Sequence, residues 1–156
     1  MKTLKDAFEH TLQDIYFAEN ELTKALPKVE KAATNKKLKE AVSKHLEETK
    51  QQIKLLDQVF KSIGVKPKGE KCDAIAGLIK ETEGIMKEAS GDALNAALIG
   101  AAQAVEHYEI ARYGTLREWA KVLGEDKAHD LLTQILDMEK AANAKLTSLA
   151  VEQVNG

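Results

Sequence analysis

Apolar residues recur at intervals of three and four along most of the chain, the spacing that places them on one face of an α-helix. Four long helices are predicted from this pattern, over about residues 3–33, 37–63, 92–123 and 125–151. The first contains Pro27, where we expect a kink or a brief break, because proline cannot donate the helical hydrogen bond. The second and third stop at Gly64 and Gly124, since glycine commonly follows the last helical residue.

The lengths of the connecting segments predict how these helices are arranged. Residues 34–37 and 124–126 are short turns, so the first two helices and the last two should each form an antiparallel hairpin. Residues 64–91 contain a short amphipathic helix and are long enough to cross the bundle from end to end. The predicted fold class is therefore all-α, a ferritin-like four-helix bundle that forms a single domain over residues 1–156.

Carboxylates interrupt the apolar face of every long helix. Followed in steps of seven residues, which keeps one helix face in view, Glu19 stands between Leu12 and Leu26. The second helix carries a whole polar patch at the same kind of position, made of His45, Glu48, Thr49 and Gln52. The carboxylates that interrupt the apolar faces are Glu19, Glu48, Glu106, Glu109 and Glu139.

The positions of these carboxylates along the helices indicate that they lie at one level. Glu109 precedes Gly124 by fifteen residues and Glu139 follows it by fifteen. Glu19 and Glu48 lie at similar distances on either side of the first turn, which at about 1.5 Å per residue is roughly 20 Å from it. If the third helix runs parallel to the second, all five carboxylates meet near the middle of the bundle.

Five buried carboxylates need neutralising charge, because each would otherwise cost several kcal/mol of desolvation. His45 and Arg112 are the cations expected near this layer, and they are too few. Shared protons with raised pKa values would be one solution and bound cations another. We interpret the cluster as a dinuclear site for iron or manganese, two ions per chain, because these ions favour oxygen ligands.

The residues of this predicted site differ in the roles we expect of them. The predicted metal ligands are Glu19, His45, Glu48, Glu106, Glu109 and Glu139. Glu19, Glu48, Glu109 and Glu139 are expected as principal ligands, while Glu106 lies in a column that borders the apolar face. For His45 two roles stay open, metal ligand or hydrogen-bonded residue that orients a carboxylate. The same choice stays open for Thr49, Gln52 and Asn143.

Four segments carry a resemblance to a known family. They are AENEL at residues 18–22, HLEET at 45–49, AAQAVEHYEIARYGTL at 101–116 and LDMEKA at 136–141. Over nearly the whole chain the sequence resembles the YciF/YciE-type family (DUF892), a branch of the ferritin-like superfamily. The resemblance implies a homodimer, an association with bacterial stress responses and a rubrerythrin-like metal site.

The sequence departs from the superfamily's usual Glu-x-x-His motif. The residue three positions after Glu48 is Gln51, and the residue three positions after Glu139 is Ala142. The imidazole of His45 comes one turn before Glu48 instead. One nitrogen ligand is therefore expected, and the second that the superfamily would supply is missing.

Charge and composition narrow the choice of partners and compartment. The 23 basic and 25 acidic residues are interleaved and give a net charge of −2, so we predict neither a nucleic-acid nor a membrane partner. Cys72 is the only cysteine, and the N-terminal residues lack an apolar signal core. These features favour a cytoplasmic protein.

Two functional hypotheses follow. In the first, the protein is a stress-associated metalloprotein whose reduced ions react with a small oxidant such as O₂ or peroxide, as a di-metal oxidoreductase would. In the second, it is a non-enzymatic, dimeric interaction protein whose carboxylate cluster is vestigial or structural. The sequence identifies no catalytic residue, and whether the protein is an enzyme stays open.

Overall fold

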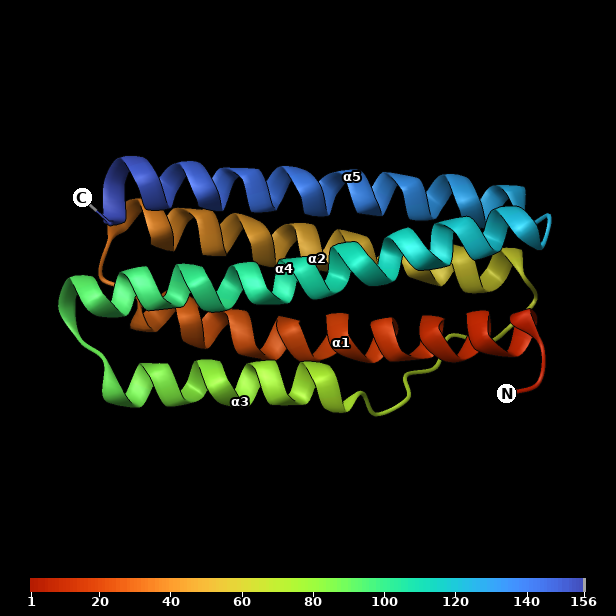
Figure 1. The fold of residues 1–156 in the computed structure, drawn as a ribbon, viewed down its shortest axis with the longest axis horizontal. Coiled ribbons are helices and arrows are strands. Elements are labelled where there is room, and N and C mark those ends of the chain that lie inside the picture. The colour runs from red at the N-terminus through yellow and green to blue at the C-terminus, as the bar shows by residue number, and fades with distance from the viewer. Residues whose placement is uncertain (156) are drawn as a thin grey trace.

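The computed structural model describes residues 1–155, and every regular element in this range is helical (Figure 1). The elements are α1 (Leu4–Ala32), α2 (Lys36–Ser62), α3 (Asp73–Glu88), α4 (Gly91–Val122), α5 (Asp126–Leu149) and a π-helical turn (Ala150–Val154). The predicted all-α class is confirmed. The four predicted long helices correspond to α1, α2, α4 and α5, and the short connecting helix is α3. Residue 156, the last of the predicted domain, lies outside the described residues.

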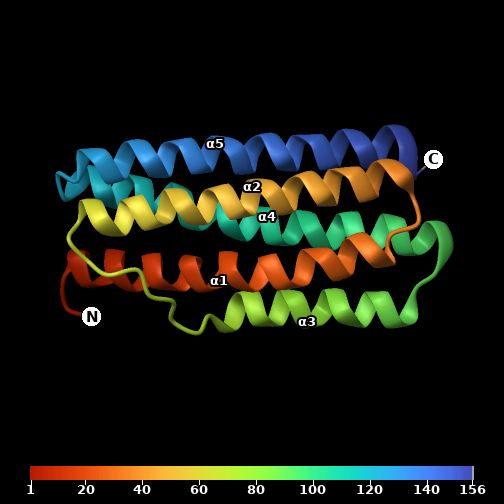
Figure 2. The same ribbon diagram turned by 180° about the vertical axis from the view of Figure 1, so that it is seen from behind.

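The four long helices surround one core. Helices α1 and α2 pack together, as do α4 and α5, and the two pairs meet through contacts of α2 with α5 and of α1 with α4. Helices α2 and α4 therefore face each other across the core. Helix α3 lies outside this arrangement, against α1 and α4, as seen from both sides in Figures 1 and 2.

Side chains at the predicted boundaries start and stop the helices. The Thr3 hydroxyl accepts a hydrogen bond from the backbone N–H of Asp6, whose carboxylate accepts one from the backbone N–H of Thr3. The Asn35 side chain accepts from the N–H of Leu38 at the start of α2. Gly64, just after α2, has a φ of 70°, a conformation that side-chain-bearing residues rarely adopt.

Of the kink or brief break that we expected at Pro27, the break is absent, since α1 continues through this residue to Ala32. Proline removes one helical hydrogen bond. Its neighbours Leu26 and Val29 are both buried in the core, and Pro27 itself is exposed. The packing of these neighbours therefore holds the helix together where the backbone lacks a bond.

A buried amide fixes the end of the bundle at the α1–α2 turn. The Oδ1 of Asn95, near the start of α4, accepts hydrogen bonds from the backbone N–H groups of Thr34 at 2.9 Å and Asn35 at 3.1 Å. Its Nδ2 donates to the Thr34 hydroxyl at 2.8 Å. Asn95 is 3% exposed, so this link sets the position of α4 relative to the first hairpin from inside the protein.

The core is largely apolar at its two ends, Asn95 apart, and carries its buried charged residues at the middle. Leucine, isoleucine and phenylalanine side chains from the four long helices fill both ends, and four glutamates lie fully buried between them. Within residues 1–155, no helix combines the length and the apolar character needed to cross a membrane.

Candidate metal centre

Three carboxylates from three helices converge at the middle of the core. Glu19 lies on α1, Glu109 on α4 and Glu139 on α5, and each is 0% exposed. One oxygen from each of the three side chains lies within 4.8 Å of the other two. The helices place them there because each glutamate occupies an inward position between buried apolar residues of its own helix. Three of the predicted ligands are thus brought together.

The surroundings of this triad disfavour negative charge. Burial, followed by the charge of Glu139, raises the pKa of Glu19 to about 7. Burial and the charges of Glu139 and Glu19 raise the pKa of Glu109 well above its usual value. Burial, followed by the contact with Glu106, raises the pKa of Glu139 as well. In the absence of a cation, the triad therefore holds protons that ordinary carboxylates release near pH 4.

Many oxygens in this region have no hydrogen-bond partner. Among the described residues, six buried carboxylate oxygens lack one: one each from Glu19 and Glu106, and both from Glu109 and Glu139. Buried polar atoms are normally satisfied, since leaving one unpaired costs free energy. A set of closely spaced, unpaired oxygens is the donor set that a hard cation such as iron or manganese needs, so the residues fit a metal site.

His45 joins the cluster through Glu106. Its Nε2 lies 2.8 Å from Oε1 of Glu106, and the two side chains are 13% and 1% exposed. Burial by itself lowers the pKa of His45, but the contacts with Glu106 at 2.8 Å and Glu48 at 3.9 Å outweigh it and raise this pKa well above 6.5. With this raised pKa, His45 favours the imidazolium form, whose charge offsets that of Glu106. It must lose its proton before either ring nitrogen can bind a metal.

Glu48 lies at the edge of the cluster, where we expected a principal ligand. Its side chain is 27% exposed, and its oxygens lie 3.8 Å from Lys44 Nζ and 3.9 Å from His45 Nδ1. The contact with His45 is the main cause of its lowered pKa, with smaller contributions from the charges of Lys44 and Lys145. Glu106, which we expected at the border, is buried instead. Glu48 and Glu106 have thus exchanged the surroundings predicted for them.

The polar residues beside the cluster are placed differently from one another. The Thr49 hydroxyl donates to the backbone carbonyl of His45 at 2.8 Å, so this hydroxyl is already engaged within its own helix. Gln52 is 1% exposed, and its Oε1 lacks a partner among the described residues, as does Oδ1 of Asn143. The role of these two amides, ligand or supporting group, stays a prediction.

The sequence was compared with models of known families. The model of the domain of unknown function DUF892 matches residues 3–156. The chain belongs to the DUF892 family.

Known members support this assignment. The protein YciF of Escherichia coli strain K12 is 49% identical over 157 residues, which cover 99% of this chain and 95% of that protein. The crystal structure of the E. coli stress protein YciF matches with a TM-score of 0.95 at 49% identity and 99% coverage of both chains. The structure of YcfI from Rhodopseudomonas palustris matches with a TM-score of 0.91 at 53% identity and 94% coverage of both chains.

A more distant structure shows the fold alone. A protein from Xanthomonas campestris pv. campestris is 21% identical and has a TM-score of 0.77, with 96% of this chain and 92% of that chain covered.

One residue of this DUF892 chain contacts the cluster without having been predicted to do so. The Tyr113 hydroxyl donates to Oε1 of Glu19 at 3.0 Å, and Tyr113 is 0% exposed. Burial and the charges of Glu19 and Glu109 raise the pKa of Tyr113, so the phenol stays a neutral donor. From the sequence, Tyr113 is expected to be a core aromatic residue whose hydroxyl has a hydrogen-bond partner. Its position seven residues after Glu106 is the signal that could have linked it to the site.

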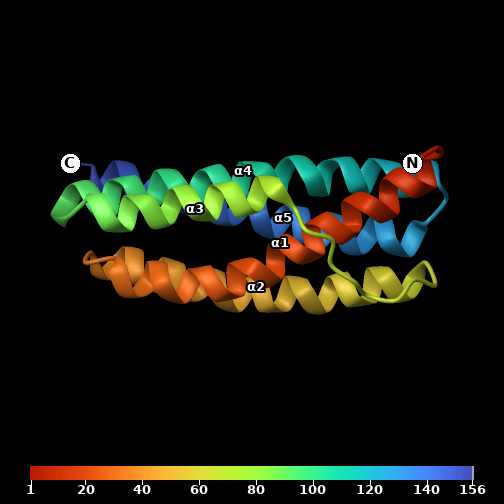
Figure 3. The same ribbon diagram turned by 90° about the horizontal axis from the view of Figure 1, so that it is seen from below.

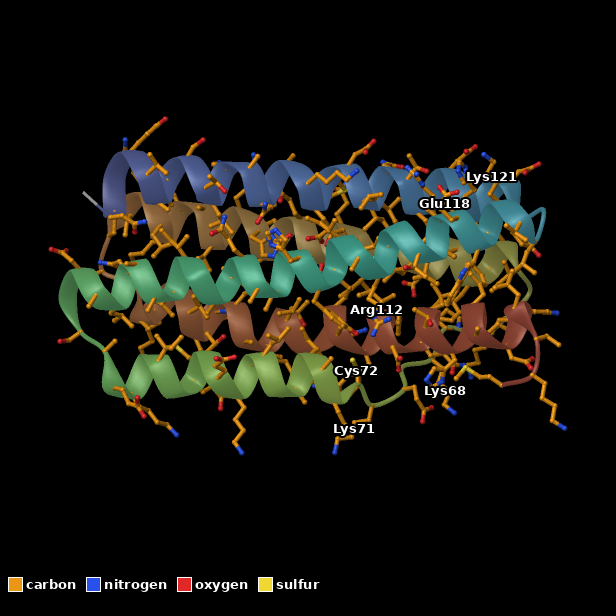
Figure 4. All side chains as sticks on the ribbon, viewed as in Figure 1. Lys68, Lys71, Cys72, Arg112, Glu118 and Lys121 are labelled. Carbon is orange, nitrogen blue, oxygen red and sulfur yellow. The ribbon has the colours of Figure 1, made fainter. Side chains whose placement is uncertain are left out.

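Arg112 does not belong to the carboxylate layer of the DUF892 chain, and counting it among the neutralising cations is wrong. The residue is exposed, with its guanidinium carbon 5.3 Å from the ring centroid of Tyr108. The Tyr108 hydroxyl lies 3.0 Å from Sγ of Cys72, the residue just before α3. Arg112 and Cys72 are labelled in Figure 4. His45 is the one predicted cation that contacts the cluster.

Proposed function

We propose that the protein is a stress-associated, ferritin-like metalloprotein that holds two iron or manganese ions in its carboxylate cluster. The observation that carries this proposal is the set of six buried carboxylate oxygens without hydrogen-bond partners among the described residues. Oxygen-rich sites of this kind favour hard cations, and four-helix bundles commonly build them from inward glutamates. The name of the E. coli relative as a stress protein supports the biological setting.

The residues of the cluster have different roles in the proposed metal site. Glu19, Glu109 and Glu139 are the first ligands, because their oxygens already lie together. Glu106 joins them when His45 gives up its proton, and Glu48 closes the edge nearest to solvent. Bound ions would supply the electrons for reaction with O₂ or peroxide. The chain supplies the ligands, the apolar surroundings that exclude water, and a proton that His45 holds next to Glu106.

Metal content tests this proposal directly. The protein is purified without added chelator, and its metal is counted by elemental analysis before and after anaerobic addition of Fe(II) or Mn(II). Two ions per chain are expected after addition. A content that stays far below one ion per chain under both conditions contradicts the proposal.

A single substitution tests the assignment of residues. The Glu109→Ala variant is expected to lose metal and keep its helical circular dichroism, since Glu109 contributes two unpaired oxygens to the cluster. Glu118→Ala removes an exposed carboxylate from the same helix and should keep the metal. If Glu109→Ala retains the full metal content, Glu109 is not a ligand.

A second function is favoured by a specific contact. The His45–Glu106 pair and the raised pKa values of the triad support a cluster that protons alone can neutralise. A purely structural protein of this kind would need no metal, and the name of the R. palustris relative suggests a structural role. The absence of metal uptake, together with full stability of the metal-free chain, would favour this function over the first.

We also propose that the protein forms a homodimer, as the family resemblance implies. The exposed face of α4 around His107 carries small residues, which suits close packing of two helices. Sedimentation of the purified protein should give twice the mass of one chain. Ala104→Arg on that face should reduce it to the mass of the monomer.

A further inference from the structure

An apolar cavity adjoins the carboxylate cluster on the side of the α1–α2 turn. It has a volume of about 100 Å³ and is lined by residues from all five α-helices, with His45 and Glu48 at the end that meets the cluster. Its other lining segments lie between residues 22–29 of α1, 98–105 of α4 and 141–146 of α5. All of these segments belong to the same half of the bundle.

Small side chains at facing positions create this cavity. Six alanines from the four long helices line it: Ala25, Ala41, Ala101, Ala102, Ala141 and Ala142. A leucine at several of these positions would fill the space, as leucines do at the other end of the core. The cavity therefore arises because all four long helices carry alanines at the same level of the bundle.

Helix α3 covers the cavity loosely. Ile79 and Met86 of α3 line the cavity, but both are only partly buried. Among the residues of α3, Asp73–Glu88, Ile75 alone is buried. Figure 3 shows α3 running alongside α4 over the half of the bundle away from the N-terminus. A cover helix with so little buried surface can move without unfolding the four long helices.

The charged residues around the cavity leave one positive charge without a near partner. Lys28 lies 3.8 Å from Glu83, and Lys44 lies 3.8 Å from Glu48. Lys145 also lines the cavity, and its charge contributes to the lowered pKa of Glu48, but within the described residues no carboxylate lies within 4.0 Å of its Nζ. The lining thus combines an apolar interior with one lysine that is available to an anion.

We propose that this cavity binds a small aliphatic carboxylate, with its hydrocarbon chain among the alanines and its anionic head at Lys145. An enclosed engineered cavity of about 150 Å³ with aliphatic walls binds benzene. The present cavity is smaller and opens to solvent beside exposed residues such as Lys145, so it suits a chain of about four to six carbons with its head group outside. Binding uses residues that are present without metal, so it does not depend on the proposed metal function.

Calorimetric titration of the full chain with hexanoate tests the proposal. Saturable binding is expected, and hexylamine, which has the same chain and the opposite charge, should bind more weakly. Ala102→Leu fills the cavity and should abolish hexanoate binding. Ala144→Leu places the same side chain at an exposed position of α5 that does not line the cavity and should leave binding unchanged. If Ala102→Leu does not fold by circular dichroism, Ala142→Leu takes its place.

The head-group assignment is tested on α5. Lys145→Gln should weaken hexanoate binding by about 1.5- to fivefold, the range expected for a solvent-accessible ion pair. Lys140→Gln removes an exposed lysine that does not line the cavity and should have no effect. Lack of saturable binding by the wild type, or equal binding by Ala102→Leu, overturns the site. Equal binding of hexanoate and hexylamine overturns the role of Lys145. Neither result bears on metal content.

Discussion

His45 on α2 and Glu106 on α4 form a 2.8 Å ion pair between helices that face each other across the core. Glu106 is 1% exposed, and its second oxygen has no hydrogen-bond partner among the described residues. The pair therefore balances a charge that could not otherwise remain at this depth. It also links the two hairpins at the level of the carboxylate triad.

Replacement of His45 by leucine should destabilise the metal-free protein. The change leaves the buried Glu106 charge without a partner, which typically costs about 3–5 kcal/mol in the free energy of unfolding. Urea unfolding at neutral pH measures the loss. The double variant His45→Leu/Glu106→Gln should recover most of it, because no buried charge remains.

The control for this prediction is His107→Leu. His107 is exposed on α4 and bonds only to the backbone carbonyl of Gln103, so its replacement should change stability by less than about 0.5 kcal/mol. A loss at His45 no larger than the loss at His107 would show that the ion pair does not support the fold.

The stability of the metal-free protein should fall as the pH rises from about 4.5 to 7. The folded-state pKa of Glu19 is raised from 4.5 to about 7 by burial and the charge of Glu139. Between these two pKa values the folded chain keeps a proton that the unfolded chain has released, so the free energy of unfolding falls as the pH rises. Over the whole window the loss is about 3 kcal/mol. The raised pKa values of Glu109 and Glu139 act in the same direction.

Denaturant unfolding at several pH values, with chelator present, checks this dependence. Glu19→Gln should flatten the slope, because the amide does not titrate. Addition of Mn(II) should reverse it, since a metal competes with protons for the same oxygens. Stability that rises with pH in the metal-free protein would mean that the triad is ionised when the chain folds.

The helices and the level of the triad could be predicted from the sequence. Apolar spacing gives each long helix to within a few residues, and equal distances from Gly124 place Glu109 and Glu139 at one height. Both inferences need only the rise per residue and the direction of each hairpin. These quantities are local, so the heights of the two glutamates can be predicted without knowledge of how the helices pack.

The surroundings of Glu48 and Glu106 could not be predicted in the same way. A straight helix turns about 20° relative to a seven-residue repeat in each heptad, so residues near the border of a face cannot be assigned from spacing alone. The contact of Glu106 with His45 also depends on which side-chain rotamer each adopts. The link between Tyr113 and Glu19 joins residues 94 positions apart and needs the folded structure.

Asn95→Ala should weaken the fold and leave the carboxylate cluster intact. The substitution removes the acceptor for the backbone N–H groups of Thr34 and Asn35, and a lost buried hydrogen bond of this kind costs about 1–3 kcal/mol. Thermal unfolding should show the loss, while metal content per chain stays that of the wild type. A loss of metal without a loss of stability would contradict this assignment.

Tyr113→Phe should weaken metal binding, because it removes a hydroxyl that bonds to the predicted ligand Glu19. The hydroxyl holds Oε1 of Glu19 at 3.0 Å, and a group that orients a metal ligand typically changes metal affinity about 10- to 100-fold when it is removed. Competition with a chelator of known affinity measures the change. Tyr108→Phe is the matched control on the same helix, because its hydroxyl contacts Cys72 and not the cluster. Equal metal affinity in the two variants would show that Tyr113 only fills the core.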